Sequence, residues 1–539
     1  MVIGNGMVGA RFAEEVRRHD PDARRVALTI LGAEHRPAYN RVLLPSLLSG
    51  SMQDRDLISH DLGWYAERQV LLRTGTAAIG LDMAARRVRT SEGDAVGYDD
   101  LVLATGARPR IPPVPRFHRL GQLRHDITAL RTIADARRLS SLAAAARRKH
   151  GRIVVLGGGV LGLEAARAMV ARGTAVTVVH RGEHLMDRQL DAPAGRALAI
   201  ATRAIGIDLR LAVEAVRWEP GQGLWVRPAS GPDAELVRAD GLLLSAGTIP
   251  ETGLATAAGL RLTPSGAIAI DDALTTSDPH VYAIGDCAGH PGAAGGLVQP
   301  GWEQAAVLAR RVTGADSRAR YRGSSCVTRL KAAGIDLTCA GDPFPELGDP
   351  DFEVLRFEDA GRYAKLVLQD DRVAGAIVLG FPDAAAGIVQ LYDRDAQVPA
   401  DRLALLLGRA LPEDAGTAGT PAALPDHAIV CRCNMVTKAQ LRDAWYGGAT
   451  SRPALSSATR AATGCGGCGT EIDAFADWLA RTDPATSPDH APRFAASAVD
   501  CAAYRGTNGT RDDHAARART SVITESMEMD VKQKEVILP

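Results

Sequence analysis

Four cysteines near the C-terminal end of the chain are spaced as ligands of one metal centre. Cys431 and Cys433 bracket one residue, and after thirty-one further residues Cys465 and Cys468 bracket two. Each pair can present two thiolates to one point in space, and intracellular cysteines paired in this way are more often metal ligands than disulfides. Four thiolates hold either a structural zinc ion or an iron–sulfur cluster.

The spacing and the neighbouring glycines favour a 2Fe–2S cluster, with zinc as the alternative. Zinc ribbons and fingers usually separate paired sulfurs by about two to four residues, whereas the first pair here brackets one. Every residue of 464–469 that is not cysteine is glycine. Glycines let the backbone approach a bulky inorganic core and donate N–H groups to its sulfides. A cluster of this kind carries one electron at a time, so the chain must also contain a source of electrons.

The N-terminus carries a dinucleotide-binding fingerprint. Residues 1–3 are predicted to end a strand, and Gly4, Gly6 and Gly9 follow with the spacing G-x-G-x-x-G before a helical stretch at 10–18. These glycines permit a tight turn and bring a pyrophosphate close to the N-terminus of a helix. One such motif is weak support by itself.

An acidic residue follows the next predicted strand, 26–31, at the position expected for a dinucleotide site. Glu34 is placed to bind a ribose hydroxyl of the adenosine half. The other interpretation of Glu34 is a solvated loop carboxylate.

A second fingerprint begins about 150 residues after the first. The apolar strand 152–156 leads to Gly157, Gly159 and Gly162, and a helix is predicted at 163–172. Two fingerprints in one chain are more specific than one. They predict two dinucleotide sites, one inserted within the other.

Two further segments indicate which fingerprint holds a flavin. The strand 101–103 runs into Thr105 and Gly106, and the segment after residue 276 ends at Gly285 and Asp286. The Asp286 carboxylate is suited to a hydrogen bond with the ribityl chain of a flavin.

In this order the four motifs resemble the two-dinucleotide flavoproteins of the disulfide-reductase superfamily over about residues 1–312. The resemblance implies that the first fingerprint binds FAD and the second binds NAD(P)H. It also implies FAD contacts from Arg41, Ala78 and Trp302, and a place near the nicotinamide for Glu164. Simple packing for Trp302 and an ordinary helix-surface charge for Glu164 are the alternatives.

The segment that would carry redox cysteines in disulfide-reducing members has none. Residues 36–46 contain no cysteine, which excludes thiol chemistry beside the flavin, and show the pattern Tyr-x-Arg-x-x-Leu. That pattern resembles the large subunit of NAD(P)H-dependent nitrite reductases and their electron-transfer relatives in assimilatory nitrate reduction. Ferredoxin reductases are similar but tend to have lysine where Ser46 stands.

Three more segments fit the same family. Residues 295–306 would cap the flavin, while 330–337 and 363–380 resemble its third, interface-type domain. The cysteine-containing segment resembles the small bacterioferritin-associated-ferredoxin type of 2Fe–2S domain. Full nitrite reductases continue into a sirohaem and 4Fe–4S domain, but after Cys468 this sequence has one further cysteine, Cys501. We therefore expect a chain that collects electrons and passes them to another protein.

Composition supports a multidomain redox protein. The 63 basic and 63 acidic residues cancel, which argues against nucleic acid or an anionic membrane as partner. No apolar run approaches the roughly eighteen residues of a membrane span. The chain opens within a predicted cofactor strand and not with a signal peptide, so we expect a cytoplasmic location.

The expected fold class is α/β, with two Rossmann-like domains, an α+β interface domain and a small helical 2Fe–2S domain. The expected boundaries are 1–115 with 245–312 for FAD, 116–244 for NAD(P)H, 313–411 for the interface domain, 412–427 for a linker, 428–482 for the cluster domain and 483–539 for a disordered tail.

The function predicted from these observations is electron transfer from NAD(P)H through FAD and a 2Fe–2S cluster to a nitrate or nitrite reductase subunit, with a homodimer as the possible assembly. The cofactors carry the chemistry, so no side chain is named as a catalytic acid or base. Three alternatives stay open: an NAD(P)H–ferredoxin or rubredoxin reductase with a fused cluster, the FAD subunit of an amine or amino-acid dehydrogenase, and a redox or iron-sensing partner without turnover.

The choice between NADH and NADPH depends on the end of the strand predicted at 175–179. His180 and Arg181 follow that strand, and Glu183 comes two residues later. NAD sites usually have a carboxylate at the deciding position, while an arginine accommodates the 2′-phosphate of NADPH. Arg181 therefore predicts dual use with a modest preference for NADPH, although the family resemblance favours NADH.

Overall fold

The computed structural model describes residues 1–292, 295–409, 421–422, 424–426, 428–431, 434, 436–462 and 468–482, without the side chains of Lys331 and Thr470. These described residues all belong to one compact unit, Met1–Ser487. Most of the predicted linker and the whole predicted tail, together with Cys433 and Cys465, lie outside them.

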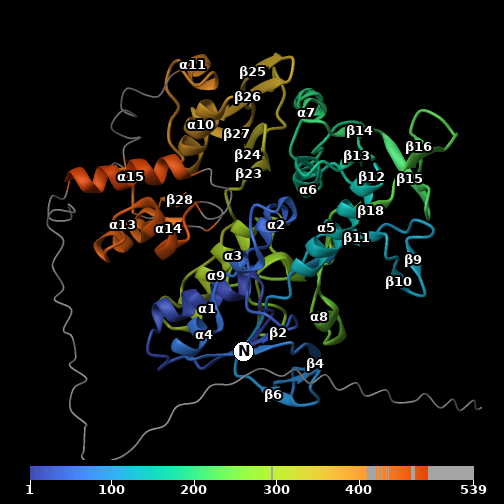
Figure 1. Cartoon of the computed structure of the whole chain (residues 1–539). Helices are drawn as coiled ribbons and strands as arrows, with labels where there is room; N and C mark the ends of the chain where they lie inside the picture. Colours follow the sequence, from blue (N-terminus) through green and yellow to red (C-terminus); the bar gives the residue numbers. More distant parts are fainter. Residues whose placement is uncertain are drawn as a thin grey trace, which may run out of the picture. The chain divides into compact units, whose positions relative to one another are not determined.

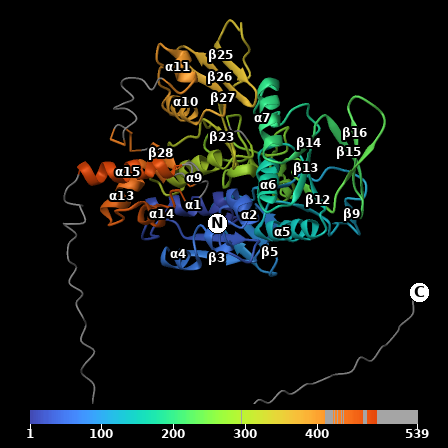
Figure 2. The same ribbon diagram turned by 45° about the horizontal axis from the view of Figure 1, so that its top comes forward.

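Five parallel strands form the sheet that carries the first fingerprint (Figure 1), in the order β21-β7-β1-β2-β3. They are β1 (Val2–Ile3), β2 (Leu28–Gly32), β3 (Val70–Thr74), β7 (Leu101–Leu103) and β21 (Val281–Ala283). The apolar runs of β1, β2 and β7 are buried, as a parallel sheet covered on both faces requires. Helices α1 (Met7–His19) and α9 (Val298–Val312), nearly 280 residues apart in sequence, pack side by side on it in Figures 1 and 2.

Smaller elements surround this sheet. They are η1 (Arg41–Leu43), α2 (Leu44–Ser49), α3 (Asp54–Leu57), α4 (Leu62–Glu67), the antiparallel meander β4 (Ala78–Asp82), β5 (Arg87–Thr90) and β6 (Ala95–Gly97), α8 (Gly253–Ala257), β20 (Ile268–Ala269), η2 (Gly285–Cys287) and β22 (Ala288–Gly289).

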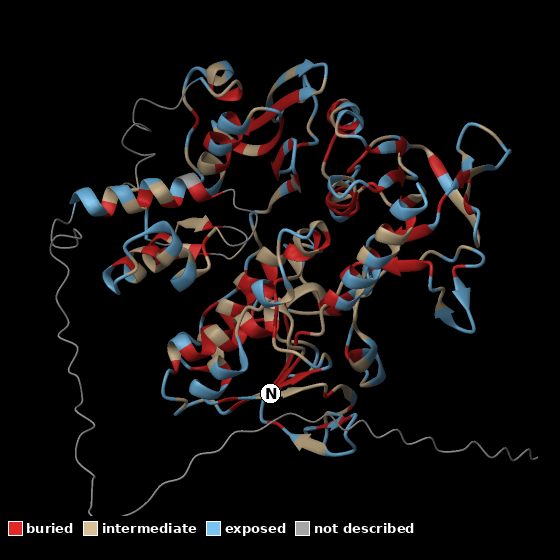
Figure 3. Ribbon diagram, in the orientation of Figure 1, coloured by how far each residue is buried: buried red, intermediate tan, exposed pale blue. Residues whose placement is uncertain are grey.

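The second fingerprint belongs to another five-stranded parallel sheet, ordered β11-β18-β12-β13-β14. Its strands are β11 (Ile127–Ala129), β12 (Arg152–Leu156), β13 (Ala175–Val179), β14 (Asp208–Arg210) and β18 (Gly241–Leu244). Its other elements are β9 (His118–Arg119), β10 (Gln122–Leu123), α5 (Ile133–Arg148), α6 (Val160–Ala171), α7 (Ala192–Ala204), β15 (Val213–Glu219), β16 (Gly223–Pro228) and β17 (Glu235–Arg238). Figure 3 shows buried residues gathered on the parallel strands and exposed residues at the tip of the β15–β16 hairpin.

One antiparallel pair shows how the second sheet is inserted into the first domain. Strand β8 (Ala107–Pro109) leads out of the first domain, and β19 (Thr248–Pro250) leads back. The two strands pair with each other, Arg108 opposite Ile249. All of β9 to β18 lies between them in sequence, so one dinucleotide-binding domain is nested within the other.

Both fingerprint helices begin earlier than predicted. The sequence placed their starts at residues 10 and 163, whereas α1 begins at Met7 and α6 at Val160. The last glycine of each motif, Gly9 or Gly162, therefore lies in the first helical turn. A Cβ at Gly9 would lie 2.0 Å from the carbonyl oxygen of Gly4, so glycine is needed there for close packing of helix against loop.

The third domain is an antiparallel sheet with helices on one side. Its strands run in the order β23-β24-β27-β26-β25. The elements are β23 (Val327–Ala332), β24 (Ile335–Gly341), β25 (Glu353–Asp359), β26 (Arg362–Gln369), β27 (Arg372–Leu379), α10 (Pro382–Arg394) and α11 (Arg402–Leu406). Leu330 and Leu337 of this sheet share one hydrophobic core with Leu163 of α6 and Leu48 of α2. This domain is thus continuous with the core of the nucleotide-binding domains.

The C-terminal domain is a small helical unit with its own core. It comprises β28 (Ile429–Cys431), β29 (Val436–Thr437), α13 (Lys438–Tyr446), α14 (Arg452–Thr459) and α15 (Gly469–Thr482). Thr437 starts α13 with a capping box, in which Gln440 bonds back to the Thr437 N–H. Trp445 and Phe475 pack in the same core as Cys431 and Cys468. No helix in the described part of the chain has both the length and the apolar character of a membrane span.

A buried charged group joins the second sheet domain to the third domain. Asp191, the N-cap of α7, accepts hydrogen bonds from the Ala194 N–H at 3.0 Å, the Tyr363 hydroxyl at 2.7 Å and the Lys365 ammonium at 3.1 Å. Burial, followed by the bond to Asp191, raises the pKa of Tyr363. Lys365 is fully buried, and its charge is compensated by the buried Asp191 and, at 3.6 Å, by the more exposed carboxylate of Glu346.

Lys365→Met should therefore lower the free energy of unfolding by about 3–5 kcal/mol, because it leaves Asp191 buried without its cation. Arg362→Met on the same strand is the control. Its ion pair with Asp359 is about half exposed and should contribute about 0–1 kcal/mol. Denaturant unfolding of the three proteins measures the difference, and equal losses in both variants would contradict the assigned role of Lys365.

Candidate functional site

One large cavity, of about 2370 Å³, lies where the two fingerprints face each other. Twelve of the predicted cofactor residues line it: Gly4, Gly6, Glu34, Arg41, Thr105, Gly106, Gly157, Gly159, Glu164, Arg181, Gly285 and Asp286. Cys468 lines the same cavity. The tertiary structure thus brings residues from three separate parts of the sequence to one space.

The first glycine loop leaves open space in front of α1. Gly4 has φ +111°, and a Cβ there would lie 2.2 Å from the carbonyl oxygen of Ala104. Gly6 is the N-cap of α1, has no capping side chain, and a Cβ there would meet nothing within 4 Å. The free N–H groups of the helix therefore face the cavity, which fits the pyrophosphate of a dinucleotide.

The second loop repeats this geometry. Gly157 has φ +125°, and a Cβ there would lie 2.1 Å from the carbonyl oxygen of Ser245. Gly159 is the N-cap of α6, and a Cβ there would again meet nothing within 4 Å. Both loops thus have the open helix N-terminus that a dinucleotide needs.

Glu34 lies at the end of the first sheet and is held from two sides. The Tyr39 hydroxyl donates to one carboxylate oxygen at 2.9 Å, and the Arg41 guanidinium to the other at 2.6 Å. Burial raises the pKa of Tyr39 to about 12, so its hydroxyl stays protonated and donating. Glu34 keeps further lone pairs for a ribose hydroxyl.

Asp286 is oriented by an arginine that the sequence analysis missed. The Arg131 guanidinium donates to the Asp286 carboxylate at 3.0 Å. Arg131 Nε is buried and has no hydrogen-bond partner among the described residues. A buried donor without a partner indicates a place for a polar ligand atom. No spacing rule pointed to Arg131, which lies in another domain of the sequence.

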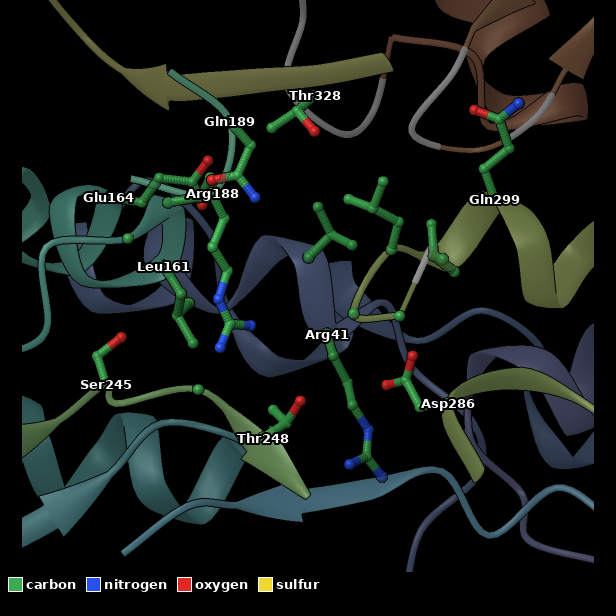
Figure 4. Close-up of a pocket in the computed structure, with 18 of the residues that line it drawn as sticks. Arg41, Leu161, Glu164, Arg188, Gln189, Ser245, Thr248, Asp286, Gln299 and Thr328 are labelled. Atoms are coloured by element: carbon green, nitrogen blue, oxygen red, sulfur yellow. The ribbon is translucent and has the colours of Figure 1, made fainter. Parts of the chain in front are cut away.

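Residues of several elements line the cavity beside the second glycine loop (Figure 4). Glu164 lies on α6 and is buried, which contradicts the alternative of an ordinary surface charge. Leu161, Arg188, Gln189 and Thr248 surround the same space. The sequence analysis missed Arg188 and Gln189, because they lie in the loop between β13 and α7, which has no recognisable motif.

His180 occupies the position where NAD sites usually have a carboxylate. The Gly158 N–H donates to its Nδ1 at 3.2 Å, so the ring proton lies on Nε2. Nε2 is buried and has no hydrogen-bond partner within the described ranges. Burial lowers the pKa of His180, so the ring is neutral near pH 7. Arg181, exposed at the cavity rim, supplies the positive charge next to it.

Four predicted residues do not line the cavity. Gly9 and Gly162 pack against the glycine loops, as described above for Gly9. Ala78 lies in β4, and Trp302 on α9 donates its ring N–H to the Met7 carbonyl at 3.2 Å. Trp302 thus packs on the start of α1, and a direct FAD contact from it or from Ala78 stays a prediction.

Two of the four cluster cysteines are described. Cys431 ends β28 and Cys468 precedes α15, and both side chains are buried. In the sequence, Cys433 lies two residues after Cys431, and Cys465 lies three residues before Cys468. Two buried cysteines in one core are compatible with a thiolate-bound cluster.

Comparison with known proteins agrees with the domains described above. A family model described as pyridine nucleotide–disulphide oxidoreductase matches residues 1–309. The chain belongs to this family. A rubredoxin NAD+ reductase C-terminal domain matches 327–389, and a BFD-like [2Fe-2S] binding domain matches 429–476. These matches confirm the predicted fold class and the predicted cofactors: FAD, NAD(P)H and a 2Fe–2S cluster.

Similar proteins include two from Bacillus subtilis (strain 168). The chain is 34% identical to a nitrite reductase [NAD(P)H], over 87% of the chain and 56% of that protein. It is 30% identical to an assimilatory nitrate reductase electron transfer subunit, over 90% of the chain and 61% of that protein. The chain thus spans little more than half the length of these relatives.

The solved structure of a covalent putidaredoxin reductase–putidaredoxin complex shares the fold, with a TM-score of 0.64, 24% identity and coverage of 75% of the chain and 94% of that structure. A ferredoxin reductase from Rhodopseudomonas palustris does so with a TM-score of 0.63, 23% identity and coverage of 74% and 95%.

The two open glycine positions should separate the two nucleotide sites. Gly6→Ala should lose bound FAD, whereas Gly159→Ala should retain FAD and bind NADP+ or NAD+ at least about tenfold more weakly, since a methyl group would stand where the pyrophosphate approaches. Gly231→Ala also places a Cβ in open space, away from the cavity, and is the control. Flavin content and calorimetric titration measure both outcomes. Equal loss of FAD in Gly6→Ala and Gly159→Ala would contradict the assignment.

Proposed function

We propose that this chain oxidises NAD(P)H and delivers the electrons, one at a time, to the catalytic subunit of a nitrite or nitrate reductase. The observation that carries the proposal is the shared cavity, which is lined by both glycine loops and by Cys468. A donor site, a flavin site and a cluster site therefore adjoin one space. The nitrite and nitrate reductase relatives give the class of acceptor.

The glycine loops bind the two dinucleotides in this proposal. Helices α1 and α6 direct free N–H groups at the pyrophosphates, and Glu34, held by Tyr39 and Arg41, binds an adenosine ribose. Asp286, oriented by Arg131, binds the ribityl chain. When bound, NAD(P)H would supply a hydride, FAD would take up its proton and two electrons, and a 2Fe–2S cluster would carry the electrons onward one at a time.

Orientation is the main contribution of the protein chain. Glu164, Leu161 and Arg188 surround the space where the nicotinamide would meet the flavin. Positioned contacts of this kind lower the barrier by holding reactants in a reactive geometry. We assign no side chain as acid or base, because bound NAD(P)H and FAD would themselves supply the hydride chemistry.

A second candidate is an NAD(P)H–ferredoxin or rubredoxin reductase with a fused cluster. The match of residues 327–389 to a rubredoxin NAD+ reductase domain favours it, as does 30% identity to a rhodocoxin reductase of Rhodococcus erythropolis over 62% of the chain. The two candidates share the donor half and differ in the acceptor. Reduction of purified nitrite reductase, rubredoxin and ferredoxin by the same preparation distinguishes them.

Cys465→Ser should separate the two redox centres. The wild-type protein should contain FAD with about two iron and two acid-labile sulfide per chain. The variant should lose the cluster but still bleach its flavin with NAD(P)H, while reduction of the partner reductase collapses. Cys501→Ser is the matched control and should retain both. Stoichiometric zinc without sulfide, or full partner reduction by Cys465→Ser, would contradict the proposal.

Arg181→Ala should change the choice of nucleotide. The wild type should use both nucleotides, because Arg181 at the cavity rim can pair with a 2′-phosphate, while the Asp187 carboxylate, 3.8 Å from His180 Nε2, keeps the preference for NADPH modest. We expect kcat/KM for NADPH to fall about tenfold in the variant, with little change for NADH. NADH serves as the internal control. A strong NADH preference that the substitution leaves unchanged would show that Arg181 points to solvent.

A further inference from the structure

An arginine of the C-terminal domain contacts the backbone of the FAD-binding domain. Arg460 follows α14, and its guanidinium Nη1 donates to the carbonyl oxygens of Ile58 at 2.6 Å and Ser59 at 2.7 Å. These two residues follow α3, about 400 positions earlier in the chain. Burial lowers the pKa of Arg460, and the carboxylate of Glu14 in the FAD-binding domain counteracts that effect.

A second contact joins the same two domains. The Asn40 amide donates to the side-chain oxygen of Asn434 at 3.2 Å, and the Asn434 amide donates to the Arg460 carbonyl at 2.6 Å. Asn434 therefore bonds both to the FAD-binding domain and to the residue that makes the first contact. We call these bonds of Asn434 and Arg460 the docking contact.

The docking contact adjoins both cysteine pairs. Asn434 directly follows Cys433, and Arg460 precedes Cys465 by five residues. Each predicted cluster loop thus carries one residue of the contact. The bond between Asn434 and the Arg460 carbonyl also links the two loops to each other.

In the FAD-binding domain, one partner of the docking contact is Asn40. It lies in the sequence between Tyr39 and Arg41, which both donate hydrogen bonds to Glu34 in the cavity. Asn40 is buried and also accepts from the Val42 N–H at 3.0 Å. The same short segment therefore faces the predicted FAD site with Tyr39 and Arg41 and the C-terminal domain with Asn40.

The backbone of Arg460 adopts a conformation that is unfavourable for a residue with a side chain. Its φ is +66°, the left-handed conformation that favours glycine at the end of a helix. An arginine at such a position gives up some local stability. The bonds to Ile58 and Ser59 provide the compensation, since hydrogen bonds from a charged donor are stronger than neutral ones.

We propose that Arg460 and Asn434 are positioning residues that dock the 2Fe–2S domain on the FAD-binding domain and so hold Cys468 at the edge of the cavity. This inference rests on the proposed function for its consequence, which is fast transfer of electrons from flavin to cluster. The docking itself is a property of the described contacts.

Arg460→Gly in the full-length holoprotein is the decisive variant. Glycine suits the left-handed φ, so the substitution removes the guanidinium without harming the end of α14. Hydrogen exchange of the 54–62 segment, where the Ser59 N–H bonds to the Ala38 carbonyl, should become roughly tenfold faster, and flavin-to-cluster transfer should slow by a similar factor. Reduction of the flavin by NAD(P)H should not change.

Two further variants test specificity. Arg452→Ala removes an arginine of the same domain whose ion pair with Asp473 lies within that domain, so exchange and transfer should match the wild type. Arg460→Lys should restore part of both, because an ammonium can still donate to the two carbonyls.

Wild-type exchange at 54–62 in Arg460→Gly would overturn the docking inference, as would an equal effect of Arg452→Ala. If NAD(P)H does not reduce the cluster of the wild-type protein, the proposed function is contradicted. Hydrogen exchange would still decide whether Arg460 docks the domain.

Discussion

Both nucleotide sites depend on the close approach of a glycine loop to the backbone carbonyl of a neighbouring segment. The carbonyl oxygen fills the space that a Cβ at the first glycine of the loop would need. The carbonyl oxygens of Ala104 and Ser245 lie against Gly4 and Gly157, each of which has a positive φ. Any Cβ would separate each loop from the neighbouring strand end. With glycine, the helix N-terminus turns towards the cavity with its N–H groups free. The same solution occurs twice in one chain, once in each nested domain.

Two carboxylates that line the cavity are paired before any ligand arrives. Glu34 is held by Arg41 and Tyr39, and Asp286 by Arg131. Each carboxylate therefore has a fixed orientation and keeps lone pairs for a hydroxyl group of the cofactor. Each arginine neutralises the carboxylate that it orients, which reduces the repulsion between that carboxylate and the phosphates of a dinucleotide. Preorganisation of this kind reduces the ordering cost of binding.

The third domain and the cluster domain join this framework in different ways. The third domain shares a hydrophobic core with α2 and α6 and adds the buried Asp191–Lys365 pair. The cluster domain has a core of its own and meets the FAD-binding domain through polar bonds of Asn434 and Arg460. An apolar core favours permanent attachment, whereas a small polar contact can open and close. Such a contact fits the proposed function, in which the domain would face the flavin and then an external acceptor.

The sequence by itself determined the two fingerprints and the cysteine pairs, because each depends on residue types at short spacings. The two fingerprints, about 150 residues apart, predicted that one domain is nested in the other, and the assignment of FAD to the first and NAD(P)H to the second came from the family resemblance of these motifs. A glycine at the start of a helix, or a cysteine two residues from another, can be interpreted from its neighbours in the sequence alone. Glu34 and Asp286 were found for the same reason, since each follows a recognisable strand. The helix starts were placed three residues late, because the final glycine of each motif lies inside the helix.

The tertiary structure decided which residues meet across long separations. Arg131 reaches Asp286 over 155 positions, and Arg460 reaches Ile58 over 402. Arg188 lines the cavity from the loop between β13 and α7. Arginines are common on this chain, and nothing local distinguishes one that orients a carboxylate from one in water. Their roles arise from the carbonyls and carboxylates that the fold places beside them, and those neighbours are set by the arrangement of whole domains.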